Sequence, residues 1–231
     1  MNYYPIALPF FFIFLGALAL LLVMVEIGVL RYAYERIGIH PRYVFALLLV
    51  SLLGAYINIP VAQLPPQHVL SGREVDFFGM RYVIPVVVDW PGTVIAVNVG
   101  GALVPAAVSL YLLARNGLWG PGLVAIALVT FVCHALAHPV PGVGIAIPIF
   151  IPPAVTAVVA LALSRRYAAP LAYIAGSLGT LIGADLLNLG KLQGLGAPVA
   201  SIGGAGTFDG VFLTGILAVL LAGLFTGRAR A

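Results

Sequence analysis

The stretch "GTLIGADLLNLGKL", residues 179–192, places one aspartate, Asp185, inside a segment that is otherwise apolar enough to lie in lipid. A carboxylate in the hydrocarbon core of a bilayer is costly, and such groups usually face the interior of a helix bundle and mark function. The chemistry of the chain therefore depends on which groups surround Asp185.

The composition of the whole chain supports this membrane setting. Of 231 residues, 62% are hydrophobic and only 8% are charged, whereas soluble domains carry about 25% charged residues. We therefore expect the lipid bilayer to be the main partner of the chain. No basic run alternates with aromatic residues, so nucleic-acid binding is not expected despite a net charge of +4. The single cysteine, Cys133, excludes an internal disulfide.

Apolar stretches long enough to span a bilayer need about 20 residues. The sequence predicts an all-α polytopic membrane protein with about seven transmembrane helices in one integral membrane domain, residues 1–231. The first stretch lacks a basic leader, so we expect a retained helix and not a cleaved signal peptide. The seven stretches lie roughly at 5–30, 43–62, 90–114, 119–138, 147–164, 169–189 and 208–227.

Two segments depart from the helical pattern. "PVPGVGIAIPIFIPP", residues 139–153, contains five prolines, which forbid a regular helix at the start of the fifth span. This segment is either an irregular connection or a re-entrant one. The polar segment at about 63–89, with alternating residues on either side of Phe78 and Gly79, predicts a short hairpin on the outer membrane surface.

The distribution of basic residues predicts the orientation, because cytoplasmic loops carry an excess of Lys and Arg. We expect a multi-pass protein of the plasma membrane with the N-terminus and the hairpin outside and the C-terminus in the cytoplasm. Three basic residues then lie outside: Arg73, Arg81 and Lys191. The others lie inside: Arg31, Arg36, Arg42, Arg115, Arg165, Arg166, Arg228 and Arg230.

This orientation places several polar residues in one layer near the outer face. Asp89 opens the third span and is followed by Trp90 and Pro91, as in a helix N-cap. Asp209 opens the seventh span after the glycine-rich "SIGGAGTF", which includes Gly206. Asp209 either caps that helix or lies beside a bound group that the glycines allow to approach a helix N-terminus.

Asp185 lies about one turn inside the sixth span, where it cannot be an N-cap, and the helix dipole opposes a carboxylate there. Asn188 shares its helix face. The GxxxG formed by Gly179 and Gly183 allows a close helix approach, so Asp185 and Asp209 could meet. Two carboxylates that share a proton are the groups used in aspartyl proteolysis. The alternative is a structural, hydrogen-bonded aspartate between helices.

Two further polar groups have competing interpretations. His134 and His138 are four residues apart, so on one helix they would share a face and, with an aspartate, could bind a divalent metal. Ala135 stands where the common metalloprotease motif has glutamate, and interfacial histidines are the alternative. No other cofactor is expected. Asn98, in "NVGGALVP", either lines a pocket or pathway or lies at a tight contact between helices.

Several blocks together resemble an uncharacterised family of archaeal and bacterial multi-pass membrane proteins, known as a domain of unknown function. The blocks are "INIPV", "VNVGGALVP", "PVPGVGIAIPIFIPP", "GTLIGADLLNL" and "SIGGAGTFDGVFLTGILAVLL". The resemblance covers most of the chain. It implies an integral membrane protein and no established activity.

A looser resemblance links "LIGADLLNL" and "GAGTFDGVFLTG" to the GxGD segment of intramembrane aspartyl proteases. The resemblance implies that Asp185 and Asp209 form a catalytic pair. This chain departs from the pattern, because Ala184 stands directly before Asp185 and two residues separate Gly206 from Asp209.

The leading hypothesis is a membrane-embedded hydrolase of the aspartyl-protease type that acts on a transmembrane peptide. Asp185 and Asp209 would be its catalytic pair, with Asn98, Asn188, Gly206 and Asp89 around the pocket. The alternative is a transporter or channel for a cation, a proton or a small polar solute that uses the same aspartates. A non-catalytic structural membrane protein is the third hypothesis. The sequence leaves the oligomeric state open.

Overall fold

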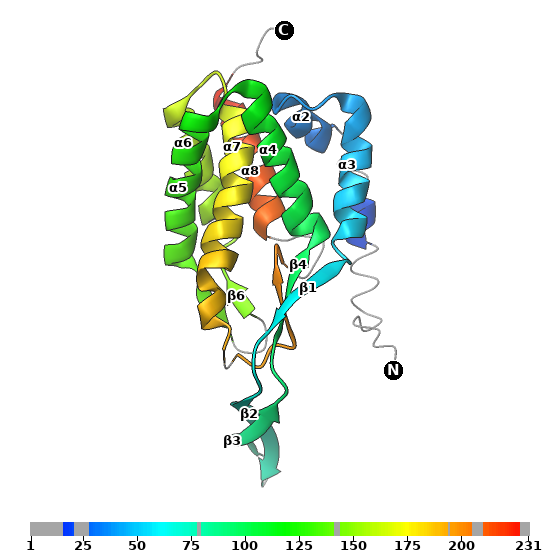
Figure 1. Cartoon of the computed structure of the whole chain (residues 1–231), viewed down its shortest axis with the longest axis vertical. Coiled ribbons are helices and arrows are strands. Elements are labelled where there is room, and N and C mark those ends of the chain that lie inside the picture. The colour runs from blue at the N-terminus through cyan, green and yellow to red at the C-terminus, as the bar shows by residue number, and fades with distance from the viewer. Residues whose placement is uncertain are drawn as a thin grey trace.

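The fold is described by a computed structural model over residues 16–20, 28–77, 80–140, 144–193, 195–204 and 210–226. A bundle of helices forms one half of the molecule, and strands extend from one end of it (Figure 1). The larger helices are α3 (Pro41–Gly54), α4 (Val104–Asn116), α5 (Trp119–Leu136), α6 (Ile151–Leu163), α7 (Ala168–Thr180) and α8 (Gly210–Phe225).

Helix α7 is the centre of the bundle and packs against α4, α5, α6 and α8. Almost all of its residues are buried, and many are small. Small residues let helix backbones approach closely, as transmembrane helices require. A Cβ added to Gly176 would lie 3.0 Å from the Cα of Gly215 on α8, so these two glycines make the contact between α7 and α8.

The GxxxG of Gly179 and Gly183 faces a different helix from the one expected. A Cβ on Gly179 would lie 2.7 Å from the Val129 side chain, and one on Gly183 would lie 2.4 Å from the Thr130 carbonyl oxygen. Both neighbours are on α5. The expectation that this motif brings the sixth and seventh spans together was therefore wrong.

Three of the described helical segments are long and apolar enough to cross a membrane: Val99–Asn116, Trp119–Leu136 and Ala168–Lys191. Three shorter apolar helices, α3, α6 and α8, accompany them. Large apolar side chains on the bundle are exposed, such as Phe131 (73%) and Leu224 (78%), as expected where lipid is the solvent. Most of the predicted first span, residues 1–15 and 21–27, lies outside the described residues.

The prediction of an all-α fold was wrong, because the chain is mostly helical but also forms strands. A sheet in the order β1-β4-β7 consists of β1 (Asn58–Gln63), β4 (Val94–Asn98) and β7 (Val199–Ile202). Strand β4 pairs antiparallel with β1 and parallel with β7. Strand β1 lies at the end of the predicted second span, and β4 lies near the start of the predicted third span. Their valines and isoleucines favour a strand as much as an apolar helix.

A hairpin is present in the segment predicted at about 63–89, but it is long and not short, and its place on the outer membrane surface stays a prediction. Strand β2 (Gln67–Phe77) pairs antiparallel with β3 (Met80–Trp90), and the ribbon projects from the end of the sheet farthest from the bundle (Figure 1). Gly92 lies at its base with φ of +103°, and a Cβ there would lie 2.2 Å from the Leu64 carbonyl oxygen. Only glycine fits where these two segments of the chain cross.

The proline-rich segment 139–153 forms a second, short hairpin before a helix. Strand β5 (His138–Val140) pairs with β6 (Gly144–Ala146), and α6 begins at Ile151. Pro152 and Pro153 lie in the first turn of α6, where a missing N–H costs nothing. The irregular entry that the prolines predicted is therefore present over the described part of this segment.

A short helix that the sequence pattern did not reveal, α2 (Val29–Arg36), lies across the end of the bundle opposite the hairpin (Figure 1). It buries Ala33 and Tyr34 against the bundle and exposes Arg31, and Ile37, directly after the helix, is also buried. Tyr34 lies 6.3 Å from the ring of Tyr173 on α7. Burial, and then the neighbouring Tyr173, raise the pKa of Tyr34 well above its usual value.

Candidate functional site

Asp185 lies where the helix that contains it changes form. Helix α7 ends at Thr180, a π-helical turn, η2 (Leu181–Asp185), follows, and a 3-10 helix, η3 (Leu186–Lys191), completes the segment. Short π-helical turns inside α-helices are frequent at functional sites. Asp185 is the last residue of the π-helical turn and is partly exposed.

One polar partner of Asp185 is the backbone of a glycine turn. The N–H of Gly203 donates a hydrogen bond to Asp185 Oδ2, with 2.7 Å between the heavy atoms. Gly203 and Gly204 both have positive φ, +87° and +79°. One partner of Asp185 therefore lies in the turn after β7.

The side chain of Asn188 supports the π-helical turn. It is fully buried, and its Nδ2 donates to the carbonyl oxygens of Gly183 at 2.8 Å and Ala184 at 2.9 Å. The change from α to π to 3-10 geometry interrupts the regular backbone ladder, and this amide satisfies two carbonyls there. Asn188 Oδ1 is buried without a hydrogen-bond partner among the described residues. Asn188 therefore holds the turn that presents Asp185, and it does not line either of the cavities described below.

Asn98 supports a second π-helical turn, η1 (Val99–Leu103), as Asn188 supports η2. Helix α4 follows η1 directly. Asn98 Oδ1 accepts a hydrogen bond from the N–H of Gly101 at 2.7 Å, and its Nδ2 donates to the Ala55 carbonyl at 2.7 Å and to Asn58 Oδ1 at 3.1 Å. The side chain is 1% exposed. Asn98 therefore lies at a tight contact between α3 and η1 and lines neither cavity.

The glycine turn after β7 joins these two helix breaks. A Cβ on Gly203 would lie 2.5 Å from the N atom of Ala102 in η1, while the Gly203 N–H bonds Asp185 in η2. Ser201 Oγ lies 2.6 Å from Asn58 Oδ1 and 2.7 Å from the Gly204 carbonyl oxygen. A polar network thus runs from Asn98 through Asn58 to the turn that holds Asp185.

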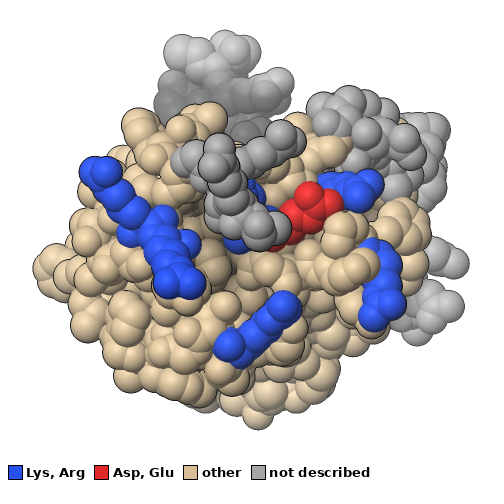
Figure 2. All heavy atoms as spheres, turned by 90° about the horizontal axis from the view of Figure 1, so that it is seen from above, with Lys and Arg blue, Asp and Glu red and all other residues tan. Residues whose placement is uncertain are grey.

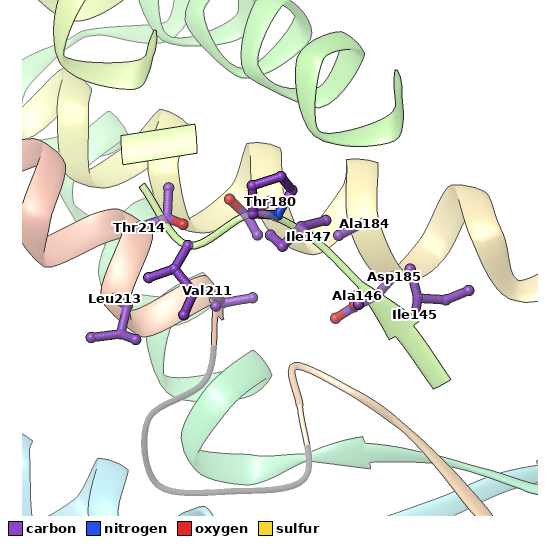
Figure 3. Close-up of a pocket in the computed structure, with 12 residues that line it drawn as sticks. Ile145, Ala146, Ile147, Thr180, Ala184, Asp185, Val211, Leu213 and Thr214 are labelled. Carbon is purple, nitrogen blue, oxygen red and sulfur yellow. The ribbon is translucent and has the colours of Figure 1, made fainter. Parts of the chain in front are cut away.

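Two cavities meet at Asp185, with volumes of about 220 Å³ and about 240 Å³. We call the first the helix cavity, because α7, η2 and α8 line it together with residues 145–149 (Figure 3). The second, the strand cavity, is lined by η3, β6, β7 and the glycine turn. Within the part of the chain that the structure describes, Asp185 and Ile145 line both.

The helix cavity contains polar groups that sequence reasoning missed. Thr180 and Thr214 line it from α7 and α8, and Figure 3 shows both near the segment that follows β6. The remaining lining is mostly apolar, including Val211 and Leu213. Threonines are common at transmembrane helix contacts, so nothing in their spacing distinguishes these two.

The predicted histidine pair is not presented by one helix. Helix α5 ends at Leu136, so His134 lies on the helix and His138 on strand β5. His138 Nδ1 lies 3.2 Å from the Leu136 carbonyl oxygen, and His134 Nδ1 is buried without a partner among the described residues. No group of three or more His, Cys, Asp or Glu side chains able to hold a metal occurs among the described residues.

The remaining predicted site residues have different outcomes. Asp89 lies in β3, opposite His68, and is exposed. It does not open a helix, so its interpretation as an N-cap was wrong. Asp209 and Gly206 lie outside the described residues. The proposed meeting of Asp185 and Asp209 therefore stays a prediction.

The bundle and site together define a class: a helical membrane protein in which a carboxylate lies at a helix break between two cavities. The family model described as "Protein of unknown function (DUF1614)" matches residues 52–221. The chain therefore belongs to this family, as the resemblance to a domain of unknown function predicted. No curated protein and no solved structure matches the chain. The similarity to intramembrane aspartyl proteases stays a hypothesis.

Proposed function

We propose that this protein is a membrane transporter or channel for a small cation, a proton or a small polar solute, with Asp185 as the binding group. One observation carries the proposal: Asp185 lines both cavities, and among the described residues Ile145 is the only other one that does so. A solute that moves between the two cavities would therefore come close to this carboxylate.

The chemistry of the lining suits a cation. The Asp185 carboxylate and the hydroxyl groups of Thr180 and Thr214 are hard oxygen donors. Ligand sites for drug-sized molecules occupy about 300–1,000 Å³. Each cavity is smaller, with volumes of about 220 and 240 Å³, so an ion with part of its water shell or a solute of few atoms is the best match.

The helix breaks support the same function. Irregular backbone at membrane depth is tolerated where protein covers it or where it lines a cavity. Discontinuous helices form substrate and ion sites in many transporters. In this chain both π-helical turns, η1 and η2, contact one glycine turn, and η2 ends at the carboxylate that lines both cavities.

Flux through proteoliposomes tests the proposal. The purified chain is reconstituted, and gradients of H⁺, Na⁺ and K⁺ are applied with ion-sensitive dyes inside. Asp185→Asn should reduce the flux by about tenfold, the factor that accompanies about 1.4 kcal/mol of lost binding free energy. The matched control is Glu35→Gln, an exposed carboxylate at the other end that pairs with Arg31 and should leave the flux unchanged. Equal flux in the wild type and Asp185→Asn would contradict the proposal.

A second function, intramembrane aspartyl proteolysis, is favoured by one specific feature of the chain. Gly204 lines the strand cavity and Gly210 lines the helix cavity, and Asp209 lies in the sequence between them. Asp185 lines both cavities, so a second carboxylate from this segment would complete a catalytic pair. Cleavage of a transmembrane peptide that is lost in both Asp185→Asn and Asp209→Asn, without ion flux, would favour the protease.

The orientation and location belong to the same proposal. The protein lies in the plasma membrane, with the N-terminus and the β2–β3 hairpin outside and the C-terminus in the cytoplasm. The distribution of basic residues supports this orientation, because described arginines gather at the end of the bundle opposite the hairpin. A cysteine-accessibility experiment at the exposed Lys191, compared with the exposed Arg166, tests it.

A further inference from the structure

The end of the bundle opposite the hairpin carries a concentration of positive charge that the proposed function does not use. Figure 2 shows basic side chains spread over this end, with one acidic group among them. Within the described part of the chain, the acidic residue at this end is Glu35. We call this surface the arginine face. It consists of Arg31, Arg36, Arg42, Arg115, Arg165 and Arg166.

Most of these arginines lie over a tyrosine close to them in sequence. Tyrosine is enriched at the membrane–water interface, and a guanidinium over an aromatic ring keeps its charge while its plane is held in place. The distances from guanidinium carbon to ring centre are 4.9 Å for Arg36 and Tyr32, 4.5 Å for Arg42 and Tyr43, 5.7 Å for Arg115 and Tyr111, and 5.3 Å for Arg166 and Tyr167.

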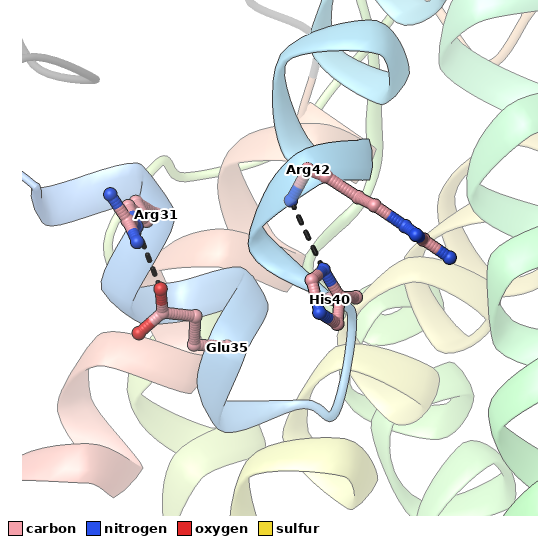
Figure 4. Close-up of polar contacts among 4 residues, drawn as sticks. All are labelled: Arg31, Glu35, His40 and Arg42. Atoms are coloured by element: carbon pink, nitrogen blue, oxygen red, sulfur yellow. Dashed lines mark hydrogen bonds and ion pairs between the residues drawn. The ribbon is translucent and has the colours of Figure 1, made fainter.

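Two of these arginines have defined polar partners. Arg31 Nε donates to Glu35 Oε1 at 2.7 Å, and this ion pair balances the charge of Arg31 (Figure 4). Arg115 Nη1 donates to the Gly38 carbonyl and to the Tyr111 hydroxyl, both at 2.7 Å. These two partners are neutral, so they fix the guanidinium and leave its positive charge in place.

Apolar side chains surround the arginine face. At this end of the bundle Trp119 is 50% exposed, and Phe225 is 75% exposed. Helix α2 lies across the same end with its apolar side on the bundle and its arginines on the outer side. A free anion would satisfy only the guanidinium groups. A lipid with an anionic headgroup satisfies the guanidinium groups with its phosphate and the apolar rim with its acyl chains.

We infer that the arginine face binds the headgroups of anionic phospholipids in the adjoining leaflet. The strongest contribution comes from Arg165 and Arg166, which lie in the turn between α6 and α7 and are both exposed. The inference is independent of the solute that the cavities accept, because the face and the cavities lie at different places in the fold.

Lipid retention tests the inference. The full chain is placed in nanodiscs with equal amounts of phosphatidylglycerol and phosphatidylcholine, and lipids that stay bound after transfer to detergent are counted by native mass spectrometry. We expect enrichment of phosphatidylglycerol, and a loss of enrichment by about fivefold or more in Arg165→Gln/Arg166→Gln, given the usual contribution of a basic residue at an anionic surface. High salt should weaken the enrichment.

Two control variants separate lipid binding from a loss of fold. Arg165→Lys/Arg166→Lys keeps the charge and should retain most of the enrichment. Lys191→Gln removes an exposed positive charge at the opposite end and should leave the enrichment intact. Equal retention of the two lipids by the wild type would overturn the inference. So would an equal loss in Lys191→Gln, or stabilisation of the chain in detergent by inorganic phosphate as strong as that by phosphatidylglycerol.

Discussion

The backbone N–H of Gly203 donates a hydrogen bond to the carboxylate of Asp185, with 2.7 Å between the heavy atoms. This bond joins the turn after β7 to the end of the π-helical turn η2. The same glycine presses against Ala102 in the other π-helical turn, where a Cβ would lie 2.5 Å from the backbone N. One residue thus fixes the position of the carboxylate relative to both helix breaks.

Replacing Gly203 with alanine should destabilise the protein for two reasons. Its φ of +87° is unfavourable for other residues, and the added Cβ meets Ala102. A strained backbone position costs about 1–3 kcal/mol, and the clash adds to it. Gly28→Ala is the matched control, because Gly28 has φ of +81° and open space around it. Thermal unfolding in detergent should show a larger decrease in midpoint for Gly203→Ala, and equal decreases would refute the role of the contact.

Removing the side chain of Asn98 should cost about 2 kcal/mol or more, because buried partners are left unsatisfied at about 1–3 kcal/mol each. Asn98→Ala loses the bonds to Gly101, Ala55 and Asn58. Asn116→Ala is the control, since its side chain makes a single bond, to the Leu112 carbonyl at the end of α4. The free energies of unfolding in a mild denaturant compare the two variants. A smaller loss in Asn98→Ala than in Asn116→Ala would contradict the network.

Gly183→Ala should push η2 away from α5. The new Cβ would lie 2.4 Å from the Thr130 carbonyl oxygen and 2.9 Å from the Cβ of Cys133. Overpacking of this kind usually costs about 1–3 kcal/mol. Gly120→Ala, in the first turn of α5, adds a Cβ with nothing within 4 Å and should cost little. Thermal midpoints of both variants check the prediction, and a neutral Gly183→Ala would show that this contact relaxes freely.

Ile145 lines both cavities together with Asp185, so we expect its size to control passage between them. Ile145→Ala should increase the flux in proteoliposomes several-fold, and Ile145→Trp should reduce it. Val158→Ala, at a side chain that is 66% exposed on α6, is the control and should change nothing. Opposite signs for the alanine and tryptophan variants are the essential result. If both reduce the flux alike, Ile145 supports the fold and does not limit passage.

The sequence could predict the membrane setting and the hairpin, because each rests on local composition or alternation. It could not predict that "TVIAVN", residues 93–98, contains the strand β4 and is followed by the π-helical turn η1. A short run of valine and isoleucine suits a buried strand and an apolar helix equally. The strand forms because β1 and β7 are available on either side as hydrogen-bond partners.

The partners of individual residues were the least predictable part of the site. Gly179 and Gly183 allow a close contact, but spacing alone does not say which helix makes it, and α5 rather than α8 does. One partner of Asp185 is a backbone N–H, and every residue except proline has one, so no side-chain pattern identifies it. Thr180 and Thr214 were missed for a similar reason, since they line a cavity that only the packing of α7, α8 and residues 145–149 creates.

The crossing at the base of the hairpin has a structural consequence. Gly92 lies against the Leu64 carbonyl, and the N–H of Leu64 donates to the Thr93 carbonyl at 2.9 Å. No loop separates β4 from η1, since one ends at Asn98 and the other begins at Val99. The base of the ribbon is therefore tied directly to the start of β4, and β4 runs without a break into η1. There the Gly203 turn contacts Ala102, and the same turn bonds Asp185, so a continuous chain of contacts joins the ribbon to the carboxylate.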